Sequence, residues 1–298
     1  VNTLLRTADY EYMLRDSRAR ALIVSAPLLP TVAPLIGKVP SLKHLIVAGP
    51  EHGEHLNFSK LLAQAEPRFE PARTLADDMC FWLYSSGSTG APKGTVHVHS
   101  SLIQTAELYG RAVLGIREDD VVFSAAKLFF AYGLGNALSF PLSVGATTVL
   151  MAERPTPDAV FARLRQHQPT IFYGVPTLYA ALLASSNLPA RGALRMRACV
   201  SAGEALPREI GERWQRHFGV DILDGIGSTE MLHIYLSNRP GDVRYGTTGR
   251  PVPGYKLEIV DEQDRPVPRG EIGELKIGGP SASDLPRQDA ICARGHPR

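Results

Sequence analysis

Short apolar runs alternate with amphipathic stretches along most of this chain. The runs at residues 21–25, 45–48, 81–85, 147–151, 171–174 and 198–201 are typical of buried strands. Helical patterns lie between several of them, as at residues 157–167 and 207–218, where a proline opens the helix without losing a needed N–H donor. This alternation predicts an α/β fold with mostly parallel, covered sheets and right-handed crossovers.

The pattern changes after about Gly246. Residues 256–261 and 274–278 are short strand-like runs on either side of a polar turn rich in Pro, Asp and Gly. They predict an antiparallel hairpin in a small β subdomain. We therefore expect an α/β part at residues 1–245, a β-rich subdomain at 246–283, and an atypical tail at 284–298.

Composition narrows the classes of function. Of the 298 residues 44% are hydrophobic, and 32 basic against 30 acidic residues give a net charge of +2. This near balance gives no footprint for nucleic acid or an anionic membrane. No apolar run approaches the ~18 residues of a membrane span. The three distant cysteines, Cys80, Cys199 and Cys292, suit a reducing cytoplasm better than a disulfide framework.

The most informative segment is residues 84–94, YSSGSTGAPKG, which follow an apolar strand. Glycines let backbone N–H groups approach an anion, hydroxyls add donors, and the lysine supplies a positive charge. A flexible Ser/Gly surface loop is the alternative, but such a loop has no need of a Pro-Lys-Gly end beside a buried strand. The segment therefore predicts a polyphosphate-binding loop.

The sequence of this segment does not match the Walker A loop or the nucleophile elbow. A Walker A loop needs Gly directly before its Lys and Ser or Thr directly after, whereas Pro92 and Gly94 flank Lys93. A nucleophile elbow needs Gly two residues after its Ser, which neither Ser88 nor Ser228 has.

Residues 85–94 instead resemble the phosphate loop of the adenylate-forming (AMP-binding) superfamily, which includes acyl- and aryl-CoA ligases, adenylation domains and luciferases. Further motifs of that family follow in order: SAGEA at 201–205, DGIGSTE at 224–230, GRPVP at 249–253 and GEIGEL at 270–275. The resemblance extends from residue 1 to about residue 283. It implies the fold of the family's large N-terminal domain.

The resemblance also implies roles for individual residues. Catalysis would involve Lys93, Thr229 and Glu230, with Thr229 at the α-phosphate of ATP and Glu230 at Mg²⁺. A lone Glu230 would be read as a solvated carboxylate, but its DGIGST context favours the metal, since magnesium takes one carboxylate beside phosphate oxygens. With Lys93, the ATP phosphates would contact Ser85, Ser86, Gly87, Ser88, Thr89 and Gly90. The adenine would be lined by the backbone of Gly203, Glu204, Ala205, Asp224, Gly225 and Ile226.

Residues 129–136, FFAYGLGN, and 230–235, EMLHIY, resemble the benzoate–CoA ligase branch of the family. By that likeness a flat aromatic ring would be surrounded by Ala131, Tyr132, Ala202, Gly227, His233 and Ile234. Tyr132 and Ile234 are equally compatible with plain core packing, and a lone histidine such as His233 is more often structural. His97 and His99 are interpreted as ordinary positions rather than metal ligands.

The implied reaction is AMP-forming acid–thiol ligation in aromatic acid degradation. An aryl carboxylate attacks the α-phosphate of ATP, pyrophosphate leaves, and coenzyme A then displaces AMP. ATP, Mg²⁺, coenzyme A and a small aromatic carboxylate are thus the expected ligands of a cytoplasmic protein, for which a homodimer stays open. Two alternatives also stay open: a nucleotide-binding module without catalysis, and a ligase for 4-hydroxybenzoate, 2-aminobenzoate, an aryl-propenoate or a fatty acid.

The chain departs from the family pattern at both ends. It resembles a fragment that begins inside the first subdomain and ends in SDLPRQDAICARGHPR, where the family continues into a ribose-binding Asp and a C-terminal domain with a catalytic Lys. Those two residues are not assigned in this chain. We therefore expect little activity from these 298 residues alone.

Overall fold

The computed structural model describes residues 1–85 and 92–282 of the chain. It divides into two compact units, one formed by residues 1–75 and 84–94 and the other by residues 76–83 and 95 onwards. The domain boundary near residue 246 is not tested by this division and stays a prediction.

The first unit is built on a small parallel sheet in the order β1-β2-β3. Its strands are β1 (Ala21–Ser25), β2 (His44–Ala48) and β3 (Leu56–Asn57), and its helices are α1 (Thr7–Asp16), η1 (Ala26–Leu28), α2 (Leu29–Val32), η2 (Ala33–Leu35) and α3 (Phe58–Gln64). Leu35 and Val47 are fully buried in its core. Strands β4 (Met79–Ser85) and β5 (Lys93–Val98) form a separate two-stranded sheet, and the division between the units falls within both strands.

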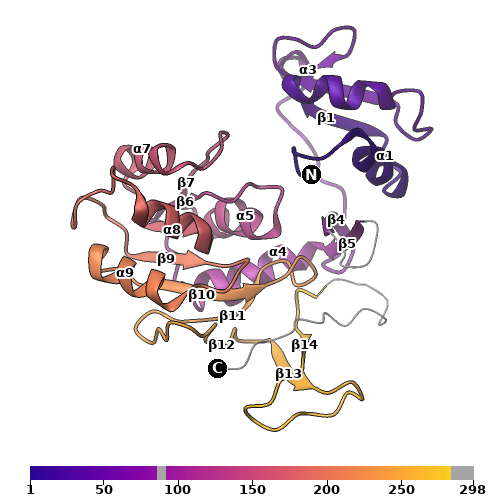
Figure 1. The fold of residues 1–298 in the computed structure, drawn as a ribbon. Helices are drawn as coiled ribbons and strands as arrows, with labels where there is room; N and C mark the ends of the chain where they lie inside the picture. The colour runs from indigo at the N-terminus through magenta and orange to yellow at the C-terminus, as the bar shows by residue number, and fades with distance from the viewer. Residues whose placement is uncertain (86–91, 283–298) are drawn as a thin grey trace. The chain divides into compact units, whose positions relative to one another are not determined.

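The second unit contains a seven-stranded sheet in the order β12-β11-β10-β9-β8-β6-β7 (Figure 1). The strands from β7 to β10 pair in parallel, whereas β10-β11 and β11-β12 are antiparallel. Their bounds are β6 (Val121–Ser124), β7 (Thr147–Val149), β8 (Ile171–Gly174), β9 (Ala198–Ser201), β10 (Ile222–Gly227), β11 (Ile234–Ser237) and β12 (Arg250–Pro251). The predicted α/β class with a mostly parallel sheet is confirmed.

The helices of this unit lie between successive strands, and those from α5 to α9 connect parallel strands of the seven-stranded sheet. They are α4 (His99–Thr105), η3 (Ala106–Arg111), α5 (Ala131–Leu134), η4 (Gly135–Ser139), α6 (Phe140–Val144), α7 (Pro157–His167), α8 (Pro176–Ala184) and α9 (Arg208–Phe218). The two predicted helices are confirmed as α7 and α9. Pro157 is the first residue of α7 as expected, while Pro207 is the cap one residue before α9.

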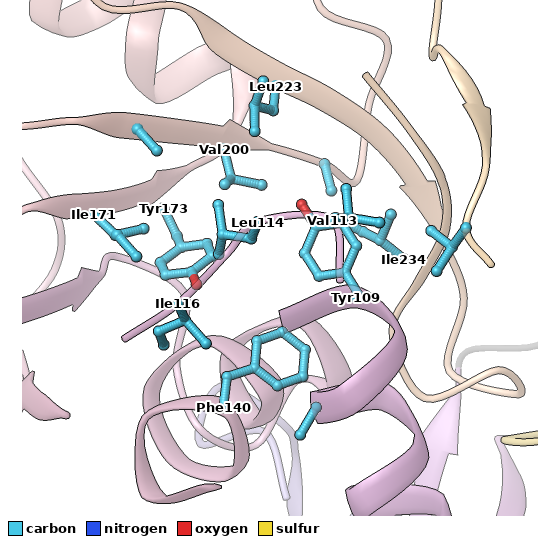
Figure 2. Close-up of a cluster of buried hydrophobic side chains, with 14 of the residues drawn as sticks. Tyr109, Val113, Leu114, Ile116, Phe140, Ile171, Tyr173, Val200, Leu223 and Ile234 are labelled. Carbon is cyan, nitrogen blue, oxygen red and sulfur yellow. The ribbon is translucent and has the colours of Figure 1, made fainter. Parts of the chain in front are cut away.

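Alternate residues of the central strands enter different hydrophobic cores because successive side chains of a strand point to opposite faces. In β8, Tyr173 belongs to a core shared with Tyr109 and Phe140, whereas Phe172 packs with Trp214 on the other face. Figure 2 shows the first core, in which Tyr109 and Phe140 lie opposite the strand residue Val200. Both faces of this sheet are therefore covered.

The predicted antiparallel hairpin is confirmed. β13 (Lys256–Val260) pairs with β14 (Glu274–Gly278) over five registered positions, from Lys256 opposite Gly278 to Val260 opposite Glu274. Asp261 organises the polar turn after β13, since its carboxylate accepts hydrogen bonds from the backbone N–H groups of Gln263 and Arg265.

Not all of the predicted buried strands are buried. β8 and β9 are buried at every position, but β1 buries only Val24 and β4 buries no residue. β1 is an edge strand and β4 belongs to a two-stranded sheet, so neither has neighbours on both sides. Within the described residues, no helix is both long and apolar enough to cross a bilayer.

Candidate functional site

The candidate site residues of the second unit gather where the parallel strands end. β8, β9 and β10 run in parallel, so their last residues, Gly174, Ser201 and Gly227, lie at one edge of the sheet, called the carboxyl edge below. In α/β sheets ligands bind outside this edge. The predicted adenine, α-phosphate and aryl residues lie within β10, in the segments that follow β9 and β10, at the start of α5 after β6, and at the start of β11.

The predicted adenine segment after β9 is open to solvent. Ala202 is buried, whereas Gly203, Glu204 and Ala205 are exposed. Gly203 has a φ of +94°, a left-handed conformation that glycine adopts without strain. The turn exposes backbone groups at the carboxyl edge, as contact with a planar base requires.

Asp224 of β10 holds the end of the segment after β9 through a hydrogen bond from Leu206. One carboxylate oxygen, Oδ2, accepts a hydrogen bond from the backbone N–H of Leu206 at 3.3 Å. Its other oxygen, Oδ1, is also buried. Burial raises the pKa of the Asp224 carboxyl to about 7, against the smaller opposing effect of donors on the backbone of Leu206, the side chain of Ser201 and the backbone of Gly225. The side chain is therefore not an ordinary surface carboxylate.

This raised pKa predicts how Asp224 affects stability. The unfolded carboxyl titrates near ~4, so the native state binds the proton more tightly and loses stability as pH rises from about 4 through 7. Asp224→Asn removes that loss while keeping an acceptor for Leu206. We expect the difference in melting temperature between Asp224→Asn and the parent protein to shift in favour of the variant by about 2–4 °C or more from pH 5 to pH 8.

Thermal melting of the full-length protein at both pH values measures this difference. Asp119→Asn, at an exposed position, is the matched control and should follow the parent. Parallel melting curves for Asp224→Asn and the parent across the pH range would contradict the assignment.

The tight turn between β10 and β11 carries Thr229 and Glu230. The carbonyl of Thr229 accepts a hydrogen bond from the N–H of Leu232 at 3.1 Å, and the Ser228 hydroxyl accepts one from Met231 N–H at 3.2 Å. Leu232 has a φ of +65° and is buried. A leucine in the left-handed region is strained, and such strain persists only where surrounding contacts hold it.

Tyr132 of α5 reaches the carboxyl edge from the other side. Its hydroxyl lies 3.2 Å from the carbonyl oxygen of Gly174 and 3.1 Å from that of Val200, at the ends of β8 and β9. Burial raises the pKa of Tyr132, so the phenol is neutral and donates to one of these carbonyls at a time. Tyr132 thus joins α5 to the sheet in addition to being a candidate pocket wall.

His233 is buried between aromatic rings at the same place. It lies 4.5 Å from Phe140 and 5.6 Å from Tyr132 between ring centroids, and its Nε2 is 3.0 Å from Oδ1 of Asn136. Burial lowers the pKa of His233 to about 3, so the ring is neutral. Nε2 carries the proton donated to Asn136, which leaves Nδ1 as a buried acceptor with no partner among the described residues.

The structure thus brings most of the predicted aryl residues together. Tyr132, Ala202 and Ile234 pack in one hydrophobic core, and His233 contacts Tyr132. Gly227 lies against the backbone of His233, because a Cβ built on it would be 2.7 Å from the His233 carbonyl oxygen. Ala131 opens α5 beside Tyr132.

Only part of the predicted phosphate loop can be placed. Ser85 ends β4 and Lys93 begins β5. The predictions for Ser86, Gly87, Ser88, Thr89 and Gly90 lie outside the described residues. The assignments of Ser85 and Lys93 to phosphates stay predictions.

The donors of the second unit are compatible with nucleotide-borne magnesium. The described residues include no group of three or more His, Cys, Asp or Glu side chains that could hold a metal. Magnesium bound through phosphate oxygens and water needs only one protein carboxylate, and Glu230 at the carboxyl edge is of the right type. Two further buried polar oxygens, Oδ1 of Asp224 within β10 and Oγ of Ser201 at the end of β9, lie on these neighbouring strands.

Two side chains of this region were not predicted as functional. Asn136 is fully buried in η4 and orients His233, while His97 is fully buried on β5 and contacts the Thr229 carbonyl. Asn136 had one signal in the sequence, a polar residue ending the apolar stretch 129–136. His97 had none, because its alternation with His99 is ordinary for a strand.

Comparison with known proteins agrees with this arrangement. A family model described as AMP-binding enzyme matches residues 1–284. The chain is 67% identical to the benzoate–CoA ligase of Thauera aromatica, over 95% of this chain and 54% of that protein. It is 50% identical to the 4-hydroxybenzoate–CoA/benzoate–CoA ligase of Rhodopseudomonas palustris, over 95% of this chain and 52% of that protein.

A solved structure gives the same result. The crystal structure of a benzoate CoA ligase from Burkholderia xenovorans LB400 superposes with a TM-score of 0.90 at 60% identity, covering 97% of this chain and 57% of that one. The chain therefore spans about half the length of the proteins that it matches.

Proposed function

The chain belongs to the AMP-binding enzyme family, and from this premise we propose that the full-length protein is an AMP-forming aryl-CoA ligase acting on benzoate. The aromatic surroundings of His233 at the carboxyl edge are the observation that carries this proposal. Tyr132 and Phe140 face its neutral ring, and Asn136 fixes the ring's orientation. Apolar walls with a few oriented polar groups suit a planar ring.

In the first half-reaction a carboxylate oxygen of benzoate attacks the α-phosphorus of ATP. The new O–P bond forms as the bond to the β-phosphate oxygen breaks, and pyrophosphate leaves with the electron pair. No general base is needed, because benzoate is ionised near pH 7. The protein's contribution is to hold the two substrates in line and to stabilise the charge that develops.

Three side chains would supply this stabilisation. Lys93 would neutralise the pyrophosphate leaving group, and the Thr229 hydroxyl would bind the α-phosphate. Glu230 would hold Mg²⁺, which when bound with ATP neutralises phosphate charge. The open turn at Gly203 and the buried Asp224 would contact the base through backbone groups.

In the second half-reaction the thiolate of coenzyme A attacks the carbonyl carbon of the adenylate. A C–S bond forms, the C–O bond to the phosphate breaks, and AMP leaves. The protein would act in the cytoplasm, where ATP and coenzyme A are available.

A pyrophosphate-release screen of the full-length protein tests the proposal. Benzoate, 4-hydroxybenzoate, 2-aminobenzoate and a short fatty acid are compared, each with ATP, Mg²⁺ and coenzyme A. We expect benzoate to give the highest kcat/KM. 4-Hydroxybenzoate is included because one relative's name carries both acids. Pyrophosphate release with none of the aromatic acids would overturn the proposal, and nucleotide binding without turnover would support a non-catalytic module instead.

A further inference from the structure

His97 occupies a position where an apolar ring would be expected. It lies on β5, is fully buried, and packs with its ring centroid 5.3 Å from that of Phe81. A phenylalanine would fill this space without burying two ring nitrogens, which is costly unless they are hydrogen-bonded. The imidazole therefore needs a reason in its polar contacts.

That contact is with the turn after β10. Nε2 of His97 lies 2.8 Å from the carbonyl oxygen of Thr229, 132 residues away in sequence. A carbonyl can only accept, so Nε2 carries the proton and donates it. Nδ1 is buried with no hydrogen-bond partner among the described residues, which agrees with a neutral ring protonated at Nε2.

The turn that receives this hydrogen bond is strained. The same Thr229 carbonyl accepts from Leu232 N–H, and this closes a turn in which Leu232 has a φ of +65°. Strained turns keep their shape only where several contacts fix them. The His97 bond is anchored outside the turn, on a different strand, so it limits where the turn can move.

We propose that His97 is a positioning residue for adenylate formation, which holds the strained turn so that Thr229 and Glu230 meet the α-phosphate and its magnesium. This inference rests on the proposed function of these two residues. The bond reaches the residue directly before Glu230, so its loss lets the carboxylate drift. A misplacement of about 1 Å can cost on the order of a hundredfold in rate.

Two variants of the full-length protein separate positioning from packing. His97→Phe keeps the ring beside Phe81 but removes the donor. His97→Gln loses the ring but places an amide N–H near the position of Nε2. We expect His97→Phe to lower kcat by about ten- to a hundredfold and to raise the Mg²⁺ concentration for half-maximal rate severalfold, with the benzoate KM unchanged. His97→Gln should recover most of both losses.

A second readout is independent of turnover. Calorimetric titration with ATP is done with Mg²⁺ and with EDTA. His97→Phe should weaken binding mainly in the presence of Mg²⁺, which a general loss of packing would not do. ¹⁵N NMR of the parent's histidines should contain a buried imidazole protonated at Nε2 that is absent from both variants.

The outcomes are distinct. If the parent forms no benzoyl-adenylate, the proposed function fails, and the NMR signature alone then decides whether His97 donates. If the parent is active and His97→Phe matches it, or if both variants lose equally, the inference is wrong. Should His97→Phe not fold, recovery of Mg²⁺ dependence in His97→Gln supports the inference and an Nδ1-protonated His97 in the parent overturns it.

Discussion

Lys93→Ala in the full-length protein is expected to slow benzoyl-adenylate formation by about ten- to a thousandfold, the scale for removing one preorganised charge contact. Lys93 begins β5 at the end of the Pro-Lys-Gly segment. In adenylation, negative charge grows on the departing pyrophosphate, and a lysine placed there stabilises the transition state more than the ground state. The affinity for benzoate should change little, because the residues proposed to surround the aromatic ring lie on other elements.

Single-turnover formation of the adenylate, followed by quenching, measures this rate without the coenzyme A step. Lys276→Ala is the matched control. That lysine lies on β14, is partly exposed and pairs with Asp264 at 2.9 Å, so its loss removes one charge away from the carboxyl edge. Adenylate formation at the parent rate in Lys93→Ala would show that this loop does not bind the phosphates.

Local sequence patterns were sufficient for the elements with strong periodicity. α7, α9, β8 and β9 carry long or continuous apolar patterns, and the structure has them at the predicted places. β10 was not predicted as a strand, because its last four residues, DGIG, resemble a polar turn. It becomes a strand through pairing with β9 and β11, and such neighbours are not encoded locally.

The site was predictable to the extent that its motifs are contiguous. The motifs at residues 201–205 and 224–230 predict one shared site. In the structure the first motif begins at the last residue of β9, and the second covers the end of the adjacent strand β10 and the turn after it. The contacts that support the site could not be predicted. Asn136 contacts His233 across 97 residues of sequence, and His97 contacts Thr229 across 132. The local sequence around Asn136 or His97 does not indicate either partner. Side chains that orient a site depend on the tertiary fold, whereas those that touch ligands recur in motifs.

Gly227 likewise has a structural role that is separate from any contact with the aromatic acid. If Gly227 only lined the floor of the proposed aryl slot, the side chain of Gly227→Val would fill the slot and leave the fold intact. In the structure a Cβ on Gly227 would lie 2.7 Å from the carbonyl oxygen of His233 and 2.8 Å from its carbonyl carbon. These are backbone atoms of the residue directly before β11, and they cannot rotate away as a side chain would. Gly227 is required by the close approach of β10 and the turn, whatever else it contacts.

We therefore expect Ala131→Leu and Gly227→Val to behave differently in the full-length protein. Ala131 is partly buried at the start of α5, and added bulk there should cost about 1–3 kcal/mol of benzoate binding. This corresponds to a benzoate KM raised by about five- to 150-fold, with ATP affinity and melting temperature close to those of the parent. Gly227→Val should instead lower the melting temperature and weaken ATP and benzoate together, since it displaces the turn bearing Thr229 and Glu230.

Substitution of Tyr132 is expected to change activity on bulky aromatic acids in the opposite direction to Ala131→Leu. Tyr132→Ala removes a wall of the proposed slot and should weaken benzoate binding while admitting bulkier aromatic acids. Tyr132→Phe is its control: it keeps the wall and loses only the hydroxyl bonded to the Gly174 and Val200 carbonyls, at about 1 kcal/mol of stability. Steady-state kinetics with benzoate and a naphthoate, together with thermal melting, distinguish these cases. If Ala131→Leu and Tyr132→Ala both treat the two acids as the parent does, these residues are core packing, and the aromatic acid binds elsewhere.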